Sequence, residues 1–273
     1  MKVSERLEGN RYPGRGIVVG FTPSGKAAVA YFIMGRSANS RNRVLELDGG
    51  ELFTKPADDS KVEDPSLIIY RALGVKGNAL VVTNGDQTDT VLNAMTGAEE
   101  GVIYEAAGEG DGNADCELGE NFSIAMSEVV FEEALCEREY EPDAPNYTPR
   151  ISGIVDLKEK RYELSILKRN EELISEDDIE EGIEASDCER EFFEYEKKDG
   201  AGHLIHTYEG DGNPLPTFVG EPREVSINDD LSEFTDEIWQ SLDEDNKIAL
   251  YTRFVDLETL EYEERLVNKY ERI

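Results

Sequence analysis

Arginines are the residues of this chain whose grouping most clearly suggests chemistry. The stretch Gly9–Leu45 holds six basic residues and no acidic one, although the whole chain carries a formal net charge of −33 at pH 7. These basic residues are Arg11, Arg15, Lys26, Arg36, Arg41 and Arg43. An acidic protein repels anions at long range, so a local cationic stretch indicates a site for a small anion, and arginine suits bidentate contacts with phosphate or carboxylate. The other interpretation is a basic strand pair that neutralises acidic neighbours, and composition does not decide between them.

A predicted hairpin positions this cationic stretch. Gly16–Phe21 and Ala27–Met34 are apolar runs rich in β-branched and aromatic residues, and turn residues separate them. The polar segment from Arg36 through Ser37 to Arg43 follows the second strand, at a position where binding loops usually lie. Gly20–Ala27 resembles a phosphate-binding P-loop, but alanine replaces the required Ser or Thr and opens a strand rather than a helix, so the sequence excludes that motif.

Two further segments have residues suited to binding or catalysis. Leu67–Leu73 and Ala79–Thr83 are predicted strands, and the turn that begins with Asn84 and Gly85 is predicted to lead into a helix with its N-cap near Thr88 or Asp89. Such a junction directs backbone N–H groups at a ligand. Glu139–Arg150 has three prolines and predicts a long irregular loop, typical of a functional segment, with a surface crossover as the alternative.

The remaining pattern predicts an α+β protein, one domain of 273 residues with two stacked, mainly antiparallel sheets and helices outside. The predicted hairpins pair Ile151–Leu157 with Tyr162–Lys168 and Ile248–Val255 with Tyr262–Val267, and the predicted helices are Ser127–Glu137 and Leu231–Leu242. The polar segment Glu46–Pro65 is expected to be a surface connection. The acidic tract Asn170–Glu191 is expected to be a solvated helix, insertion or linker near residues 170–190.

Composition and spacing exclude several classes of function. The chain has no apolar run of membrane-spanning length and no signal-peptide pattern, so we expect a cytoplasmic protein without a membrane partner. Its three cysteines and two histidines show no metal-ligand spacing, and Gly108–Asp115 lacks the residues of a calcium loop, so we predict an acidic turn there and no metal. Six bases in so acidic a chain cannot follow a phosphate backbone, which argues against nucleic acid as a partner.

Five motifs resemble the archaeal-type inosine monophosphate (IMP) cyclohydrolases. They are Tyr12-Pro-Gly-Arg-Gly, Met34-Gly-Arg-Ser-x-x-Ser-Arg-Asn-Arg, Thr83-Asn-Gly-Asp-Gln-Thr-Asp, Tyr140-Glu-Pro-Asp-Ala-Pro-Asn-Tyr-Thr-Pro-Arg-Ile and Tyr208-Glu-Gly-Asp-Gly-Asn-Pro-Leu-Pro. The resemblance covers the chain from Tyr12 to about Pro222. It implies a hydrolase of purine biosynthesis that closes 5-formamidoimidazole-4-carboxamide ribotide (FAICAR) to IMP with loss of water. It also implies a four-layer α-β-β-α sandwich like that of the N-terminal-nucleophile hydrolases, and no metal or other cofactor.

The same resemblance implies roles for individual residues. Tyr70 and Glu141 are similar to the family's proton-transfer residues, although Tyr70 could equally be a core aromatic and Glu141 a surface carboxylate. Arg150 is expected to position the substrate or to stabilise an oxyanion. The residues expected to bind the substrate are Arg36, Ser37, Arg41, Arg43, Asn84, Gly85 and Tyr147. The alternatives are a non-catalytic purine-ribotide-binding protein and an amide hydrolase of the same fold, and the sequence leaves open whether the chain forms a homo-oligomer.

Overall fold

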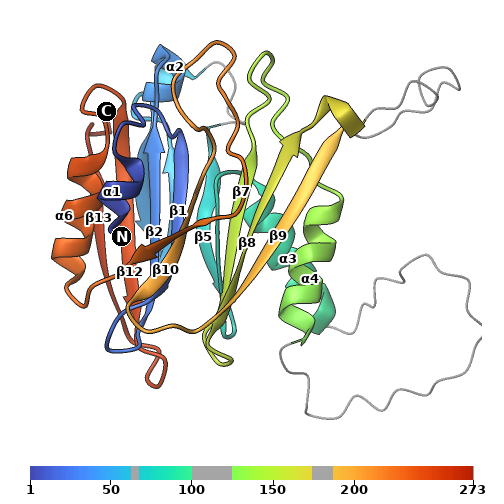
Figure 1. The fold of residues 1–273 in the computed structure, drawn as a ribbon, viewed down its shortest axis with the longest axis vertical. Coiled ribbons are helices and arrows are strands. Elements are labelled where there is room, and N and C mark those ends of the chain that lie inside the picture. The colour runs from blue at the N-terminus through green and yellow to red at the C-terminus, as the bar shows by residue number, and fades with distance from the viewer. Residues whose placement is uncertain (63–67, 100–124, 174–186, 273) are drawn as a thin grey trace, which may run out of the picture.

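Two antiparallel β-sheets stack face to face and form the centre of the protein, whose computed structural model describes residues 1–62, 68–99, 125–173 and 187–272 (Figure 1). The six-stranded sheet contains, in spatial order, β11 (Arg223–Ser226), β10 (Ala201–His206), β1 (Arg15–Phe21), β2 (Ala27–Met34), β12 (Lys247–Val255) and β13 (Tyr262–Asn268). The seven-stranded sheet contains β3 (Val44–Asp48), β4 (Glu51–Lys55), β5 (Tyr70–Lys76), β6 (Ala79–Thr83), β7 (Arg150–Asp156), β8 (Arg161–Arg169) and β9 (Cys188–Glu196).

Helices cover the outer faces of the two sheets. Figure 1 shows α1 (Val3–Leu7) and α6 (Leu231–Ser241) outside the six-stranded sheet, and α3 (Gln87–Glu99) and α4 (Ala125–Cys136) outside the seven-stranded sheet. The short helix α2 (Ala38–Arg41) lies at one end of the sandwich, and two 3₁₀ turns, η1 (Asp59–Lys61) and η2 (Glu171–Leu173), complete the described helices. The layers therefore run α-β-β-α, as expected from the sequence.

Successive side chains along each strand point to opposite faces of the sheet, and those that face the other sheet form the core between the two sheets. Side chains at every second position of β1, including Ile17 and Val19, face the opposite sheet, while Val18 packs on the outer face beneath α6. Because both faces of β1 and β2 are covered, every residue in these strands is buried. The continuous apolar runs in the sequence reflect this two-sided burial. Ala27 opens β2, which confirms that the P-loop-like segment is a hairpin.

The prediction of a surface connection over Glu46–Pro65 is wrong. β3 and β4 form a hairpin in which Asp48 pairs with Glu51 across a Gly49-Gly50 turn. Both glycines have positive φ, 59° and 84°, a conformation that suits a two-residue hairpin turn and that glycine adopts without strain. The hairpin was missed because this edge of the sheet is half exposed and its strands are rich in polar residues.

The acidic tract is also in part a strand. β9 begins at Cys188, inside the tract, and pairs antiparallel with β8. Lys168 on β8 lies 2.6 Å from Glu191 and 3.5 Å from Glu189, so a cross-strand cation offsets the acidic residues of this edge strand. Residues 174–186 of the tract lie outside the described residues, as does the predicted acidic turn at 108–115.

Other boundaries differ by smaller amounts. The helix after the Asn84 turn begins at Gln87 rather than after Thr88 or Asp89, and β5 begins at Tyr70 rather than at Leu67. In the part of the chain that the structure describes, no helix is long and apolar enough to cross a membrane. Cys136 and Cys188 are both free thiols.

Candidate active site

One cavity lies where the end of β2, the start of β1 and the loop before β7 meet. Its volume is about 460 Å³. Its walls are formed by Tyr12, Gly14, Arg15, Met34, Arg36, Ser37, Asn39, Ser40, Arg43, Glu141, Asp143, Asn146, Thr148, Tyr208 and Leu215. Segments far apart in the sequence therefore supply a cationic wall and an acidic wall to the same space.

The cationic wall comes from the segment between β2 and β3. Arg36 is stacked over the Tyr12 ring, with its guanidinium carbon 5.0 Å from the ring centroid. Its Nη1 also donates to the Gly212 carbonyl at 2.8 Å and pairs with the Asp211 carboxylate. Arg43 lines the same wall and is buried. Burial raises the pKa of the Tyr12 phenol, and the nearby charges of Arg15, Arg43 and Arg36 oppose the rise.

Ser37 forms the N-cap of α2 and lines the cavity. Its Oγ accepts a hydrogen bond from the Ser40 N–H at 3.1 Å, which fixes the turn that follows Arg36. Arg41, by contrast, does not line the cavity. Its Nε donates to the Gly35 carbonyl at 3.1 Å and its Nη2 to Asn246 Oδ1 at 3.3 Å, so its side chain joins this segment to the loop before β12.

The acidic wall includes a buried ion pair. Arg15 at the start of β1 donates from Nη1 and Nη2 to the two carboxylate oxygens of Glu141, at 2.8 and 3.0 Å. Nη1 also donates to the Asn84 carbonyl at 2.9 Å. Burial lowers the pKa of a guanidinium, but the Glu141 carboxylate more than offsets this, and the pKa of Arg15 stands well above its ordinary value. Glu141 is therefore a buried carboxylate and not a surface one.

Two buried tyrosines form a hydrogen bond between the sheets. The hydroxyl groups of Tyr31 on β2 and Tyr70 on β5 are 2.7 Å apart. Burial holds the pKa of Tyr31 well above its ordinary value, so this phenol keeps its proton. Both phenols lie close enough to Arg15 to interact with its charge, although Tyr70 is not part of the cavity wall.

Asp143 receives two hydrogen bonds from a single residue. The Thr148 N–H donates to Asp143 Oδ1 and the Thr148 hydroxyl to Oδ2, each at 2.6 Å. The Thr148 hydroxyl oxygen is in turn hydrogen-bonded to the Tyr208 hydroxyl. Burial, with the nearby Glu141 charge, raises the pKa of Asp143, and burial also raises the pKa of Tyr208. The pKa of the Asp143 carboxyl thus lies above its ordinary value, which favours proton uptake.

The Asn84 turn contacts the cavity wall through Arg15, which donates to the Asn84 carbonyl. Asn84 is fully buried; its Oδ1 accepts from the Ile151 N–H at 2.9 Å and its Nδ2 donates to the Pro149 carbonyl at 2.8 Å. A Cβ at Gly85 would overlap the guanidinium of Arg150. Arg150 donates to Asp86 at 2.7 Å and to Gln87 at 2.8 Å.

Tyr147 has a left-handed backbone, with φ 43°, and its ring lies beneath Arg169, whose guanidinium carbon is 4.1 Å from the centroid.

Of the residues predicted to bind or act on substrate, the structure brings Arg36, Ser37, Arg43 and Glu141 to the cavity wall. The wall does not include Arg41, Tyr70, Asn84, Gly85, Tyr147 or Arg150. Contacts between these six residues and a substrate stay predictions.

Several residues of the cavity were not singled out from the sequence as site residues. They are Tyr12, Arg15, Asp143, Thr148 and Tyr208. Each lies inside one of the five motifs, so the motifs contained the signal. Only the tertiary structure shows that these positions face the same space.

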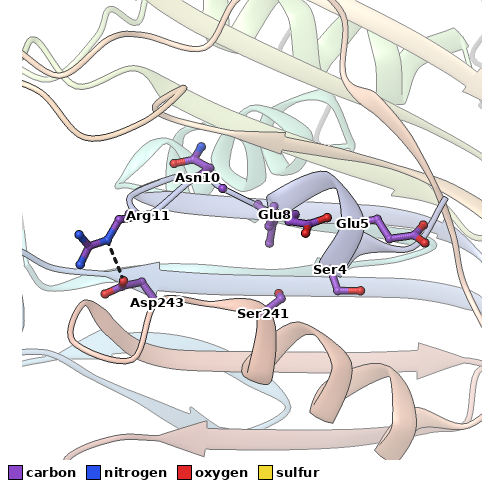
Figure 2. Close-up of a pocket in the computed structure, with 9 residues that line it drawn as sticks. Ser4, Glu5, Glu8, Asn10, Arg11, Ser241 and Asp243 are labelled. Carbon is purple, nitrogen blue, oxygen red and sulfur yellow. Dashed lines mark hydrogen bonds and ion pairs between the residues drawn. The ribbon is translucent and has the colours of Figure 1, made fainter.

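A second hollow, of about 440 Å³, lies between α1 and the C-terminal end of α6 (Figure 2). Arg11 faces Asp243 there, 3.3 Å from Nε to Oδ2, and Glu5 and Glu8 border the same hollow. These carboxylates disfavour an anionic ligand. Arg11 therefore belongs to a different part of the surface from Arg36 and Arg43.

Both histidines pack against aromatic side chains. Among the described residues, no group of three His, Cys, Asp or Glu side chains could hold a metal ion. The Nδ1 of His203 is 2.6 Å from the Tyr162 hydroxyl, and its ring stacks on Tyr195 with centroids 3.6 Å apart. Burial lowers the pKa of His203 to about 4 and that of His206 to about 3, so both are neutral near pH 7.

Comparison with known proteins identifies the family. The sequence pattern described as "IMP cyclohydrolase-like protein" matches residues 12–106 and 117–259. The chain belongs to this family. The matched ranges contain every residue of the cavity wall.

Three archaeal relatives carry the name IMP cyclohydrolase. The protein of Methanococcus aeolicus is 27% identical over 172 residues, which cover 63% of this chain and 70% of the relative. Those of Methanopyrus kandleri and Methanothrix thermoacetophila are 28% and 31% identical over 145 residues, 53% of this chain in each case. These last alignments span 59% and 57% of the two relatives.

Proposed function

We propose that this protein is an IMP cyclohydrolase that closes FAICAR to IMP with loss of water, the last step of purine synthesis. The observation that supports it most directly is a cavity, in a member of this family, that is lined by three arginines and two carboxylates, Arg15, Arg36, Arg43, Glu141 and Asp143. A purine ribotide has the matching polarity, with an anionic phosphate at one end and transferable protons at the other. The substrate would be a small molecule, and the predicted cytoplasmic location and lack of a nucleic-acid partner stay predictions.

The reaction needs positioning and proton transfer. The carboxamide nitrogen attacks the formyl carbon and loses one proton, while the formyl oxygen gains one and becomes a carbinolamine hydroxyl. The former formamide nitrogen then loses its proton, the carbon–oxygen bond breaks, and the oxygen leaves as water. Each step moves one proton from nitrogen to oxygen, so the enzyme must hold the two groups together and carry protons between them.

The cavity supplies groups for each of these tasks. Arg36, Arg43 and Ser37 would bind the phosphate, because guanidinium and hydroxyl donors suit its oxygens. Arg15 would stabilise negative charge that develops on the formyl oxygen, since its position is fixed by Glu141 before the substrate binds. Glu141 retains lone pairs that Arg15 does not use, so its carboxylate could still accept a proton. The predicted proton-transfer role of Glu141 and Tyr70 would then be carried out next to the buried Arg15.

Fold and domain organisation fit the same proposal. We propose that the α-β-β-α layers are those of the N-terminal-nucleophile hydrolases and that residues 1–273 form one domain. The support is that strands from both ends of the chain share a sheet, since β1 and β2 from the N-terminal part lie beside β12 and β13 from the C-terminal part. Arg150 is not part of the cavity wall, so its predicted role, to position the formyl group or stabilise an oxyanion, would require its guanidinium to reach the substrate from outside that wall.

Turnover of FAICAR tests the function. The purified protein is mixed with FAICAR, and formation of the purine ring is followed by ultraviolet absorbance against the spontaneous rate. We expect a large acceleration and IMP as the product. Binding of IMP without acceleration would instead identify a non-catalytic ribotide-binding protein, and release of formate with 5-aminoimidazole-4-carboxamide ribotide would identify an amide hydrolase.

A further inference from the structure

The loop before β7 carries two carboxylates on the cavity wall, and they have different partners. Both oxygens of Glu141 accept hydrogen bonds from Arg15, which has no proton to give up near neutral pH. Both oxygens of Asp143 accept hydrogen bonds from Thr148, whose hydroxyl proton can move. Asp143 is therefore the carboxylate that is connected to a mobile proton.

The directions of these hydrogen bonds follow from the chemistry of the groups. An ionised carboxylate can only accept, so the Thr148 hydroxyl must donate its single proton to Asp143. That hydroxyl has no second proton, so in its contact with Tyr208 it must be the acceptor and the phenol the donor. The three groups form a directed chain, from the Tyr208 O–H through the Thr148 O–H to the Asp143 carboxylate, and all three line the cavity.

A chain with this direction can take up a proton and then return it. If the Tyr208 oxygen accepts a proton from the substrate, its own proton passes to Thr148 and the Thr148 proton passes to Asp143. Every hydrogen bond in the chain is then reversed. Asp143 now donates to Thr148, Thr148 donates to Tyr208, and the Tyr208 O–H is left to donate into the cavity.

We propose that Asp143, Thr148 and Tyr208 form a proton relay that takes a proton from a substrate nitrogen and returns it to the oxygen that leaves as water. The relay rests on the proposed ring-closing function. It operates once in the attack step and once in the loss of water, and each time one proton leaves nitrogen, one arrives on oxygen and the three side chains return to their starting state. No oxidant, metal or external acid is needed for this balance.

The surroundings of the relay favour this cycle. Thr148 and Tyr208 are 3% and 4% exposed, so bulk water has little access to the protons in transit. The charged groups that act on Asp143 are Glu141, which raises its pKa, and Arg15, which opposes the rise. Tyr208 is stacked near Tyr12, with ring centroids 6.0 Å apart and planes 16° from parallel, so its ring is held in one orientation.

The decisive variant is Thr148→Val, which removes the hydroxyl but keeps the shape of the side chain and the backbone N–H that donates to Asp143. We expect kcat for FAICAR to fall on the order of 10²-fold, the usual contribution of proton transfer, with KM changed less than about threefold. Thr148→Ser restores a hydroxyl and should recover most of the lost rate. Thr235→Val is the matched control, because Thr235 is a buried, hydrogen-bonded threonine of α6 outside the cavity.

A second measurement covers the case in which Thr148→Val does not fold. Tyr208→Phe removes the first donor and should lower kcat to a similar extent. In the wild type we expect kcat to fall as the pH falls and Asp143 becomes protonated, and Asp143→Asn, which cannot take up this proton, should lack that dependence. If the wild type closes FAICAR and either Thr148→Val or Tyr208→Phe keeps the wild-type kcat, the relay is wrong but the proposed function stands. Wild-type protein that does not accelerate ring closure would overturn the proposed function, and the relay with it.

Discussion

Two arginine–carboxylate pairs border the cavity, and they differ in their access to water. The side chains of Arg15 and Glu141 are 7% and 6% exposed, whereas those of Arg36 and Asp211 are 33% and 57% exposed. A buried pair cannot be separated without leaving an uncompensated charge in a low-dielectric environment, but an exposed pair exchanges readily with water or with another ion. Residue types are nearly the same in both pairs, so burial decides that one is a fixed part of the site and the other a replaceable contact.

This difference suggests how a ligand would enter. The guanidinium of Arg36 pairs with the Asp211 carboxylate and also donates to the carbonyl of Gly212 in the same loop. A phosphate with two negative charges would compete with Asp211 for this arginine. The buried Arg15–Glu141 pair is joined by two hydrogen bonds, so we expect it to stay in place when a phosphate binds.

The largest expected effect comes from breaking the buried pair. Glu141→Gln leaves the buried Arg15 charge without its counterion, so the free energy of unfolding should fall by about 3–5 kcal/mol. Urea denaturation followed by circular dichroism measures the change. Replacing both partners, Arg15→Met with Glu141→Leu, should cost less than the sum of the single changes, because no charge is left buried. A Glu141→Gln protein within about 1 kcal/mol of the wild type would contradict the importance of burial.

The tyrosine pair beside Arg15 gives the next largest effect. Tyr70→Phe removes the hydroxyl that is hydrogen-bonded to Tyr31 and is predicted to act in proton transfer, so kcat for FAICAR should fall on the order of 10²-fold with little change in KM. Tyr31→Phe keeps the Tyr70 hydroxyl and removes only its partner, so its effect should be smaller. Steady-state kinetics of both variants tests this order, and a Tyr70→Phe protein with the wild-type kcat would show that Tyr70 is only a core aromatic.

Removal of the exposed cation should affect binding rather than folding. Arg36→Ala deletes a charge-assisted contact worth about 1.5–3 kcal/mol, so KM should rise roughly 10- to 100-fold while kcat changes much less. Because the Arg36 pair is partly exposed, the free energy of unfolding should change by only about 1 kcal/mol or less, well below the change expected for Glu141→Gln. Arg11→Ala is the control, since Arg11 lies at the other hollow. An unchanged KM for Arg36→Ala would remove Arg36 from the phosphate site.

The smallest effect is expected for the counterion of Arg36. Asp211→Asn removes a competitor of the phosphate, and an exposed pair contributes about 0.2–1 kcal/mol, so KM should fall by about 1.5- to 5-fold. High salt screens exposed charges and should reduce the difference between the variant and the wild type. KM values at low and high ionic strength provide the measurement. A rise in KM would mean that Asp211 positions Arg36 for the ligand instead of competing with it.

Local patterns in the sequence were sufficient for much of the fold. The strand Ala27–Met34 was predicted with its observed ends, because its apolar β-branched and aromatic run is bounded by turn residues on one side and glycine on the other. The helix Leu231–Ser241 was predicted within one residue for a similar reason, since its apolar face recurs with helical spacing. The hairpin β3–β4 was missed although Gly49-Gly50 signalled its turn, because its half-exposed strands resemble a loop in composition.

The sequence alone determined the cationic stretch, the strands on either side of it and the motifs of the family. Only the tertiary structure decided which of the arginines share a cavity and which carboxylate is held by which partner. Arg15 and Glu141 are 126 residues apart, and Thr148 and Tyr208 are 60 apart, so no local pattern could pair them. The physical reason is that propensity and periodicity act within a strand or helix, whereas contacts between side chains at the strand ends depend on how the two sheets pack against each other.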